Sequence, residues 1–181
     1  MRCMKDVLIR LEQPEDAQPL DALLKASFPG HFEARLVRTL RQSSRLYLGM
    51  VAQQAAGLLA FLLFTPVRCP ARPKARLLGL GPVAVTPAAR GQGLGTRLLR
   101  AGLSAARDTG AEAVFVQGDS GFYDDFGFVP AATLGLETLW HPPGSELLIK
   151  PLQGTAPRDL GASVYFHPAF EGEGLAADTD T

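Results

Sequence analysis

Residues 77–96 of the 181-residue chain read LLGLGPVAVTPAARGQGLGT, and this stretch decides the fold. Its first nine residues, 77–85, are almost entirely apolar, which is typical of a strand that is buried on both faces. The glycine-rich segment 90–95 follows, and the leucines after it recur at helical spacing to about Asp108. The stretch therefore predicts a buried strand, a tight turn and an amphipathic helix, in that order.

Pro82 stands inside the predicted strand, where a regular central strand would not accept it. Proline has no N–H to donate to a neighbouring strand, so within sheets it is confined to edges and bulges. Together with Gly81, it predicts a bulge or a local splaying of the sheet at this point.

The glycine-rich turn at the start of the helix predicts an anion-binding site. The first N–H groups of a helix lack partners within the helix and carry the positive end of its dipole. Glycines let a phosphate approach that backbone, and Arg90 adds positive charge. The segment has neither the lysine of a nucleotide triphosphatase loop nor the glycine spacing of a dinucleotide fold. The alternative is that its glycines serve tight packing only.

The flanking sequence predicts one α/β domain over residues 1–171, followed by a disordered acidic tail at 172–181. Helices are expected from Pro14 and from about Phe32, and a single helical turn at 122–126. Strands are expected at 7–11, 47–53, 58–65, 113–116, from residue 128, at 146–152 and, as a last edge strand, at 164–166.

Charge and composition exclude several classes of function. The chain has 18 basic and 18 acidic side chains, but residues 1–110 hold 16 basic and 7 acidic ones, against 2 and 11 in residues 111–181. This asymmetry disfavours a uniformly basic nucleic-acid binder and fits a protein with one anionic and one cationic ligand. The alternative is that the two halves simply attract each other or are solvated. The longest apolar run, 58–64, is too short to span a membrane. Two cysteines and three scattered histidines do not form a structural metal site. We expect a cytoplasmic protein without metal, nucleic-acid or membrane partners.

The motifs of this region resemble those of the GNAT superfamily of acetyl-CoA-dependent N-acetyltransferases. The central signature of that family is Gln/Arg-x-x-Gly-x-Gly/Ala, and Arg90, Gly93 and Gly95 match it. The downstream segment FYDDFGF, residues 122–128, is similar to the family's Tyr-x-x-x-Gly-Phe. LGPVAV, RGQGLG, VQGD and FYDDFGF, in that order, resemble a bacterial subgroup of the family. These motifs span residues 78–130, and the order of elements agrees over most of the chain.

The resemblance implies a GNAT-like acyl-CoA N-acyltransferase fold, with helices on both faces of a mixed sheet that splays between strands 77–85 and 113–116. Acetyl-CoA, the acyl donor, would enter this cleft, and no metal would be required. Its pantetheine arm would pair with the main chain of Val83, Ala84 and Val85. Its pyrophosphate would meet the turn and helix start formed by Arg90, Gly91, Gln92, Gly93, Leu94, Gly95 and Thr96.

The resemblance also implies that Tyr123 is the general acid that protonates the leaving thiolate. An ordinary tyrosine has a pKa near 10, so it keeps its proton at neutral pH. The alternative is that Tyr123 is a packing residue in a phenylalanine-rich turn.

The general base is not determined, because strand 77–85 carries no acid or histidine. Glu33, His31, Asp119 and Asp124 are candidates. Glu33 and His31 lie in the segment that, by resemblance, covers the acceptor side, although Glu33 could equally be a solvated helix carboxylate. Asp119 could instead cap the 122–126 turn. A reaction without a base, accelerated mainly by proximity, is also open.

The predicted function is transfer of an acetyl group from acetyl-CoA to a primary amine of a small molecule or peptide, by direct attack. Asp119, Asp124 and Asp125 cluster near the expected acetyl end and favour a cationic acceptor, unless they are merely solvated turn residues. The alternative, a non-catalytic acyl-CoA-binding sensor or interaction module with the same fold, rests on the lack of an evident base. Dimers are common in the family, so a homodimer is an open alternative to a monomer.

Overall fold

The computed structural model describes residues 6–43, 47–154 and 157–170, and the predicted tail at 172–181 lies outside these residues. Seven strands of the described chain form one mixed sheet in the order β1-β2-β3-β4-β5-β7-β6. They are β1 (Leu8–Leu11), β2 (Leu48–Gln54), β3 (Gly57–Val67), β4 (Leu77–Val85), β5 (Ala113–Gly118), β6 (Val129–Pro130) and β7 (Glu146–Pro151). The helices are α1 (Ala17–Ser27), α2 (Phe32–Ser43), α3 (Leu94–Asp108) and α4 (Ser120–Tyr123), with short 3-10 turns between elements.

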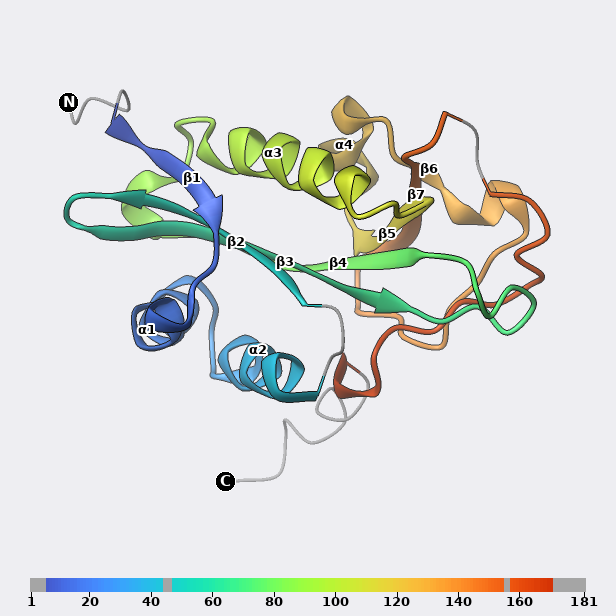
Figure 1. Cartoon of the computed structure of the whole chain (residues 1–181), viewed down its shortest axis with the longest axis horizontal. Helices are drawn as coiled ribbons and strands as arrows, with labels where there is room; N and C mark the ends of the chain where they lie inside the picture. Colours follow the sequence, from blue (N-terminus) through green and yellow to red (C-terminus); the bar gives the residue numbers. More distant parts are fainter. Residues whose placement is uncertain (1–5, 44–46, 155–156, 171–181) are drawn as a thin grey trace.

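Helices cover both faces of the sheet, as predicted (Figure 1). Strand β3 explains why, because its successive side chains point to opposite faces and both sets are apolar. Phe61 and Leu63 belong to the core that includes α1 and α2, whereas Leu62 and Phe64 belong to the core beneath α3. None of the helices in the described parts of the chain is long and apolar enough to cross a membrane.

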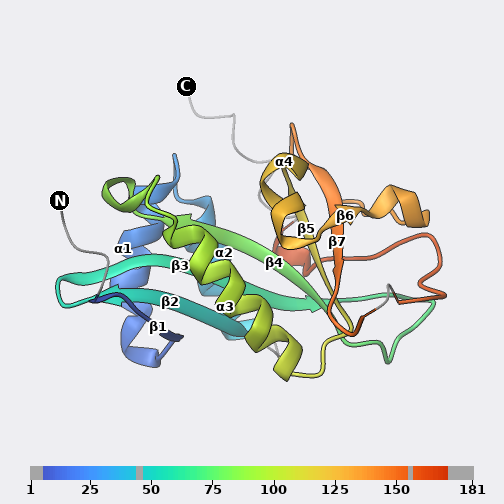
Figure 2. The same ribbon diagram turned by 90° about the horizontal axis from the view of Figure 1, so that it is seen from above.

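The sheet splays between β4 and β5, which confirms the predicted cleft. These parallel strands pair only from Leu77 opposite Ala113 to Leu80 opposite Val116. Beyond Leu80, β4 continues to Val85 without β5 beside it, and Figure 2 shows β5 and β7 running at a steep angle to β2 and β3. The gap therefore opens at the carboxyl end of β4, just before the glycine-rich turn.

The predicted bulge at Pro82 is also present. On its other side β4 pairs with β3, and the register shifts between Leu62, opposite Val83, and Phe64, opposite Leu80. Gly81 and Pro82 thus face a single residue of β3, and the peptide bond between them is cis. Proline cannot donate a hydrogen bond to a neighbouring strand. The register shift between β3 and β4 therefore falls at Pro82, next to the point where β4 and β5 part.

The prediction of a last edge strand at residues 164–166 is wrong. Within this segment Tyr165 makes only an isolated bridge, with Arg68. Ser163, just before the segment, makes another with Glu137. The side chain of Phe166 is 1% exposed and occupies the space beside Gly79, where an added Cβ would lie 2.6 Å from its ring. The apolar pattern of this segment therefore reflects packing against the sheet face and not a place in the ladder.

Candidate active site

The start of α3 presents unpartnered backbone N–H groups to solvent. Gly93 is the N-cap, in the left-handed conformation with φ of 72°, and it has no side chain to cap the helix. The first bond of the helix runs from the N–H of Arg97 to the carbonyl of Gly93, at 3.1 Å. The N–H groups of Leu94, Gly95 and Thr96 therefore precede the helical ladder. The first turn contains no acidic residue, so nothing opposes the binding of an anion here.

Two glycines of this turn are not required by packing. An added Cβ at Gly91 or at Gly93 would meet no atom within 4 Å, although both residues have a φ of 72°. At Gly95 an added Cβ would make an ordinary contact with Val85 at 3.5 Å. Because the space above the glycines is open, tight packing does not explain them, and their backbone angles and free rim suit a phosphate-sized anion.

The long side chains of the turn are used to hold its shape. The Arg90 guanidinium donates to the carbonyl of Val85 at 3.1 Å and to the carbonyl of Ser27 at 2.8 Å, so it connects the end of β4 with the end of α1. The Gln92 amide donates to the carbonyl of Ala88 at 3.0 Å. Arg90 contributes charge at the rim, while the backbone of the turn is left to face a ligand.

The end of β4 directs backbone groups into the gap beside β5. The N–H of Thr86 donates to Leu59 of β3 at 2.8 Å, and successive residues of a strand direct their N–H and C=O groups to opposite sides. Ala84 therefore faces β3, whereas Val83 and Val85 face the gap. A ligand strand or an extended arm could pair with them there.

A cavity of about 190 Å³ lies where β4 and β5 part. It is bounded by the α1–α2 junction, the bulge of β4, the end of β5, α4 and two loop segments near the C-terminus. Its lining residues are Phe28, Phe32, Glu33, Leu36, Leu80, Gly81, Pro82, Val83, Val116, Gln117, Tyr123, Trp140 and Phe170. The structure thus brings two predicted site residues, Glu33 and Tyr123, to one cavity at the mouth of the gap.

Tyr123 is seated by a glycine at the end of β5. An added Cβ at Gly118 would lie 2.4 Å from the tyrosine ring, so only glycine leaves the ring this space. The ring also packs edge-on against Phe122 and Phe128, with centroids 5.0 and 5.3 Å away. Burial raises the pKa of Tyr123 to about 12, so its hydroxyl stays protonated and can act only as a hydrogen-bond donor or neutral acceptor near neutral pH.

The other candidate bases occupy different positions. Asp119 caps α4 by accepting a hydrogen bond from the N–H of Gly121 at 3.0 Å. This is the capping role that the sequence offered as the alternative to a general base. His31 and Asp124 are exposed and do not line the cavity. Glu33, in the first turn of α2, is half-buried in the cavity lining.

Sequence reasoning missed several cavity residues. Trp140 lies in a loop and Phe170 in a short 3-10 helix, both without a recognisable motif and far along the chain from the glycine-rich turn. Gln117 was part of the VQGD motif, but its role was not assigned. Its side-chain amide donates to the carbonyl of Trp140 at 2.7 Å and accepts from Ser145 at 3.2 Å, so it positions the loop that carries Trp140.

Comparisons with known proteins agree with this geometry. The model of the acetyltransferase (GNAT) family matches residues 14–128. YhbS, an uncharacterised N-acetyltransferase of Escherichia coli, is 36% identical over 165 residues, which is 91% of this chain and 98% of YhbS. The crystal structure of Escherichia coli YhbS in complex with CoA is similar, with a TM-score of 0.81, 34% identity and coverage of 94% and 95% of the two chains. The crystal structure of a GNAT family acetyltransferase from Brucella melitensis in complex with acetyl-CoA is also similar. Its TM-score is 0.74 at 30% identity, and the match covers 91% of this chain and 97% of the other.

Proposed function

The chain belongs to the GNAT family of acetyltransferases, and we propose that it moves the acetyl group of acetyl-CoA to a primary amine bound in the cavity beside Tyr123. Acetyl-CoA is the donor in this family, and similar structures contain CoA or acetyl-CoA. The acceptor is a free amine on a small molecule or on a peptide.

One observation carries this proposal: the free edge of β4 joins the open start of α3 to the cavity that contains Tyr123 and Glu33. Beyond Leu80 that edge has no strand beside it. A cofactor with a diphosphate at one end and a thioester at the other matches such an arrangement. The diphosphate would accept hydrogen bonds from the backbone of residues 91–96, and the pantetheine arm would pair with Val83 and Val85.

The residues of the cavity have complementary roles in the transfer. The lone pair of the amine forms the new C–N bond to the thioester carbonyl carbon, and the C–S bond breaks with its electron pair on sulfur. One proton leaves the nitrogen, and sulfur receives one proton, so the products are an amide and the free thiol of CoA. The backbone N–H of Val83 stabilises the negative charge that develops on the carbonyl oxygen.

Tyr123 supplies the proton to sulfur and is reprotonated from solvent. Burial raises the pKa of Tyr123 to about 12, so the hydroxyl keeps its proton near neutral pH and is available as a donor when the C–S bond breaks. Glu33 accepts the amine proton, directly or through one water molecule. Both groups line the same cavity, so one bound amine and one thioester could reach both of them.

The test is to mix the protein with acetyl-CoA and a panel of primary amines, and to measure thiol release together with the mass of the acetylated amine. We expect amine-dependent thiol release with one acetyl group added per thiol. Stabilisation of the protein by CoA without acetylation of any amine would contradict the proposal and would favour an acyl-CoA sensor. No feature of the described residues favours that alternative at present.

Two other expectations from the sequence stay predictions. The first is a location in the cytoplasm, and the second is a homodimer. Light scattering of the purified protein at several concentrations would decide between monomer and dimer.

A further inference from the structure

Aromatic side chains converge on the cavity from four parts of the chain. Phe28 and Phe32 come from the α1–α2 junction, Tyr123 from α4, and Trp140 and Phe170 from the segments after β6 and β7. The remaining lining is also mostly aliphatic, with Glu33 and Gln117 as the polar exceptions besides the tyrosine hydroxyl. A strongly hydrated or multiply charged molecule would lose its water here without replacement.

The aromatic wall on one side of the cavity is rigidly packed. The Trp140 ring lies edge-on to Phe166, with centroids 5.1 Å apart, and against Phe170, with centroids 4.9 Å apart. Phe166 is in turn held beside Gly79 of β4. Trp140 is therefore fixed by the core, so the wall is already formed before any ligand binds.

Glu33 is the only acidic residue among the cavity lining of the described chain. Its carboxylate makes no hydrogen bond or ion pair with another described residue, although it is half-buried and lines the same cavity as the aromatic rings. A carboxylate in such surroundings attracts one cation. Asp119, Asp124 and Asp125, which favoured a cationic acceptor in the sequence, are exposed and do not line the cavity.

The cavity is also small. Its volume is about 190 Å³, and the acetyl group of the donor has to share it. A compact amine fits this space, whereas the additional ammonium groups of a polyamine or an aminoglycoside would have no carboxylate to pair with inside it.

We infer that the acceptor is a compact primary amine with a single ammonium group and an apolar, preferably aromatic, body, and that Glu33 and Trp140 select it. This inference rests on the proposed function, because it names the substrate class of the same site. The ammonium group pairs with Glu33 and lies against the faces of the aromatic rings. The body of the amine replaces water along the apolar wall.

The same surroundings prepare the amine for reaction. Burial in an apolar site disfavours a charged ammonium ion relative to the neutral amine, and the neutral amine is the nucleophile. Glu33 thus attracts the cation from solvent, and the apolar wall promotes loss of its proton once the amine is bound.

A matched set of amines tests this substrate class by thiol release from acetyl-CoA. 2-Phenylethylamine carries one ammonium group and a ring, ethylamine lacks the ring, and spermidine has additional ammonium groups. We expect kcat/KM for 2-phenylethylamine to exceed the values for both others by about tenfold or more. Equal or faster transfer to ethylamine or spermidine would overturn the inference and leave the proposed function standing. Failure to acetylate any amine would overturn both.

Two variants test the residues that we assign to selection. Glu33→Gln should raise KM for 2-phenylethylamine by about tenfold while KM for acetyl-CoA stays unchanged. Glu15→Gln is its matched control, because Glu15 is an exposed helical carboxylate far from the cavity lining. An unchanged KM in Glu33→Gln, or an equal rise in the control, would remove Glu33 from acceptor binding.

Trp140→Leu should reduce the ratio of kcat/KM between 2-phenylethylamine and ethylamine by about fivefold or more. A ratio within one variant does not depend on how much of the protein is folded, so it remains interpretable if the variant is unstable. Leu139→Ala is the control, since the neighbouring Leu139 side chain is 73% exposed and does not line the cavity. An unchanged ratio in Trp140→Leu would remove this residue from acceptor selection.

Discussion

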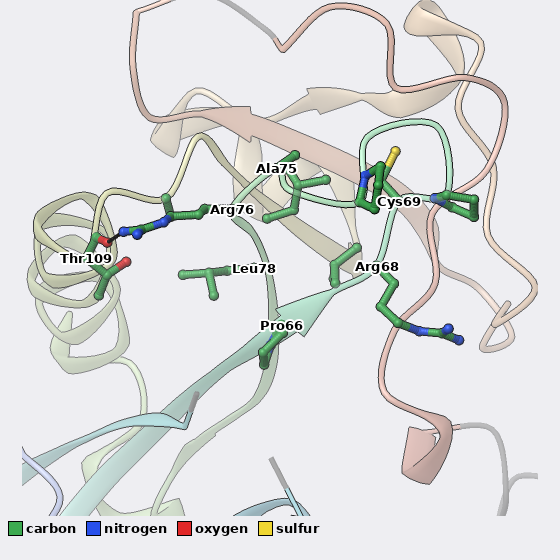
Figure 3. Close-up of a pocket in the computed structure, with 12 residues that line it drawn as sticks. Pro66, Arg68, Cys69, Ala75, Arg76, Leu78 and Thr109 are labelled. Atoms are coloured by element: carbon green, nitrogen blue, oxygen red, sulfur yellow. Dashed lines mark hydrogen bonds between the residues drawn. The ribbon is translucent and has the colours of Figure 1, made fainter. Parts of the chain in front are cut away.

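Two cavities adjoin β4, one at its beginning and one at its middle, and they differ in size and in chemistry. At the beginning of β4 a pocket of about 600 Å³ lies between the end of β3, the loop after it and the last turn of α3 (Figure 3). Along residues 80–83, where β4 leaves β5, the cavity beside Tyr123 has about 190 Å³. Volume alone would favour the large pocket as the binding site.

The polar groups around the large pocket already have partners. Arg76 donates to the carbonyl of Thr109 at 3.0 Å, and the Cys69 thiol donates to the carbonyl of Leu160 at 3.0 Å (Figure 3 shows the side chains of Arg76, Thr109 and Cys69). In the small cavity, the Glu33 carboxylate has no partner among the described residues, and the free edge of β4 leads from this cavity to the start of α3. Unmatched polar groups at a break in the sheet, and not volume, therefore distinguish the candidate active site.

Substitution of Tyr123 is the strongest test of this distinction. Tyr123→Phe removes only the hydroxyl from a ring that is otherwise held by packing. We expect kcat to fall about 10²-fold, because protonation of the leaving thiolate loses its donor, while the affinity for CoA measured by calorimetry stays the same. A normal kcat, whether or not the affinity for CoA falls, would remove Tyr123 from the chemistry.

The open glycines should matter for the donor. Gly93→Val places a β-branched residue at a φ of 72° and fills the free rim of the helix start, so KM for acetyl-CoA should rise about tenfold or more. Gly135→Val is the matched control, since Gly135 has a φ of 69°, equally open surroundings and no part in the site. Equal KM values for the two variants would mean that the anion site is misplaced.

A packing glycine in the middle of β4 should behave in the opposite way. An added Cβ at Gly79 would lie 2.6 Å from the Phe166 ring and 3.0 Å from Val67. Gly79→Ala should therefore lower the free energy of unfolding by about 2 kcal/mol in a denaturant titration. KM for acetyl-CoA should stay within about twofold of the parent value. A large rise in this KM with unchanged stability would contradict the assignment of Gly79 to packing and of the glycines in the turn after β4 to binding.

The raised pKa of Tyr123 predicts the alkaline side of the pH profile. Because burial raises the pKa to about 12, the acid form needed for donation persists well above pH 10 and is lost only near pH 12. With a neutral-amine nucleophile, kcat should rise with pH and show no descending limb between pH 8 and 10. A loss of activity with a midpoint near 10, absent in Tyr123→Phe, would show that the hydroxyl titrates like a solvated tyrosine.

The smallest effect is expected at the large pocket. Ala75→Phe adds an aromatic ring to its half-buried lining and reduces its volume. Acetyl transfer should stay within about twofold of the parent rate, because this pocket shares no lining residue with the cavity that contains Tyr123. A tenfold loss of kcat/KM in a variant of normal thermal stability would assign the large pocket to the site.

Much of the fold was predictable because its signals are local. The apolar run of β3, the proline of β4 and the glycine-rich turn before α3 each act over a few residues, and the structure contains a strand, a bulge and a helix start at the expected positions. The wrong prediction of a strand at residues 164–166 also came from a local signal. An apolar triplet indicates burial, but it does not show whether the segment pairs in a sheet or packs on its face, as Phe166 does beside Gly79.

The sequence alone determined where backbone groups would be left without partners, because proline, glycine and helix starts restrict hydrogen bonding within their own neighbourhood. It did not determine the surroundings of Glu33. Only the tertiary structure brings Phe32, Trp140 and Phe170 to the cavity that Glu33 also lines, and it leaves Asp124 exposed. The physical reason is that side chains more than 100 residues apart meet only through the packing of the whole core, which no local pattern records.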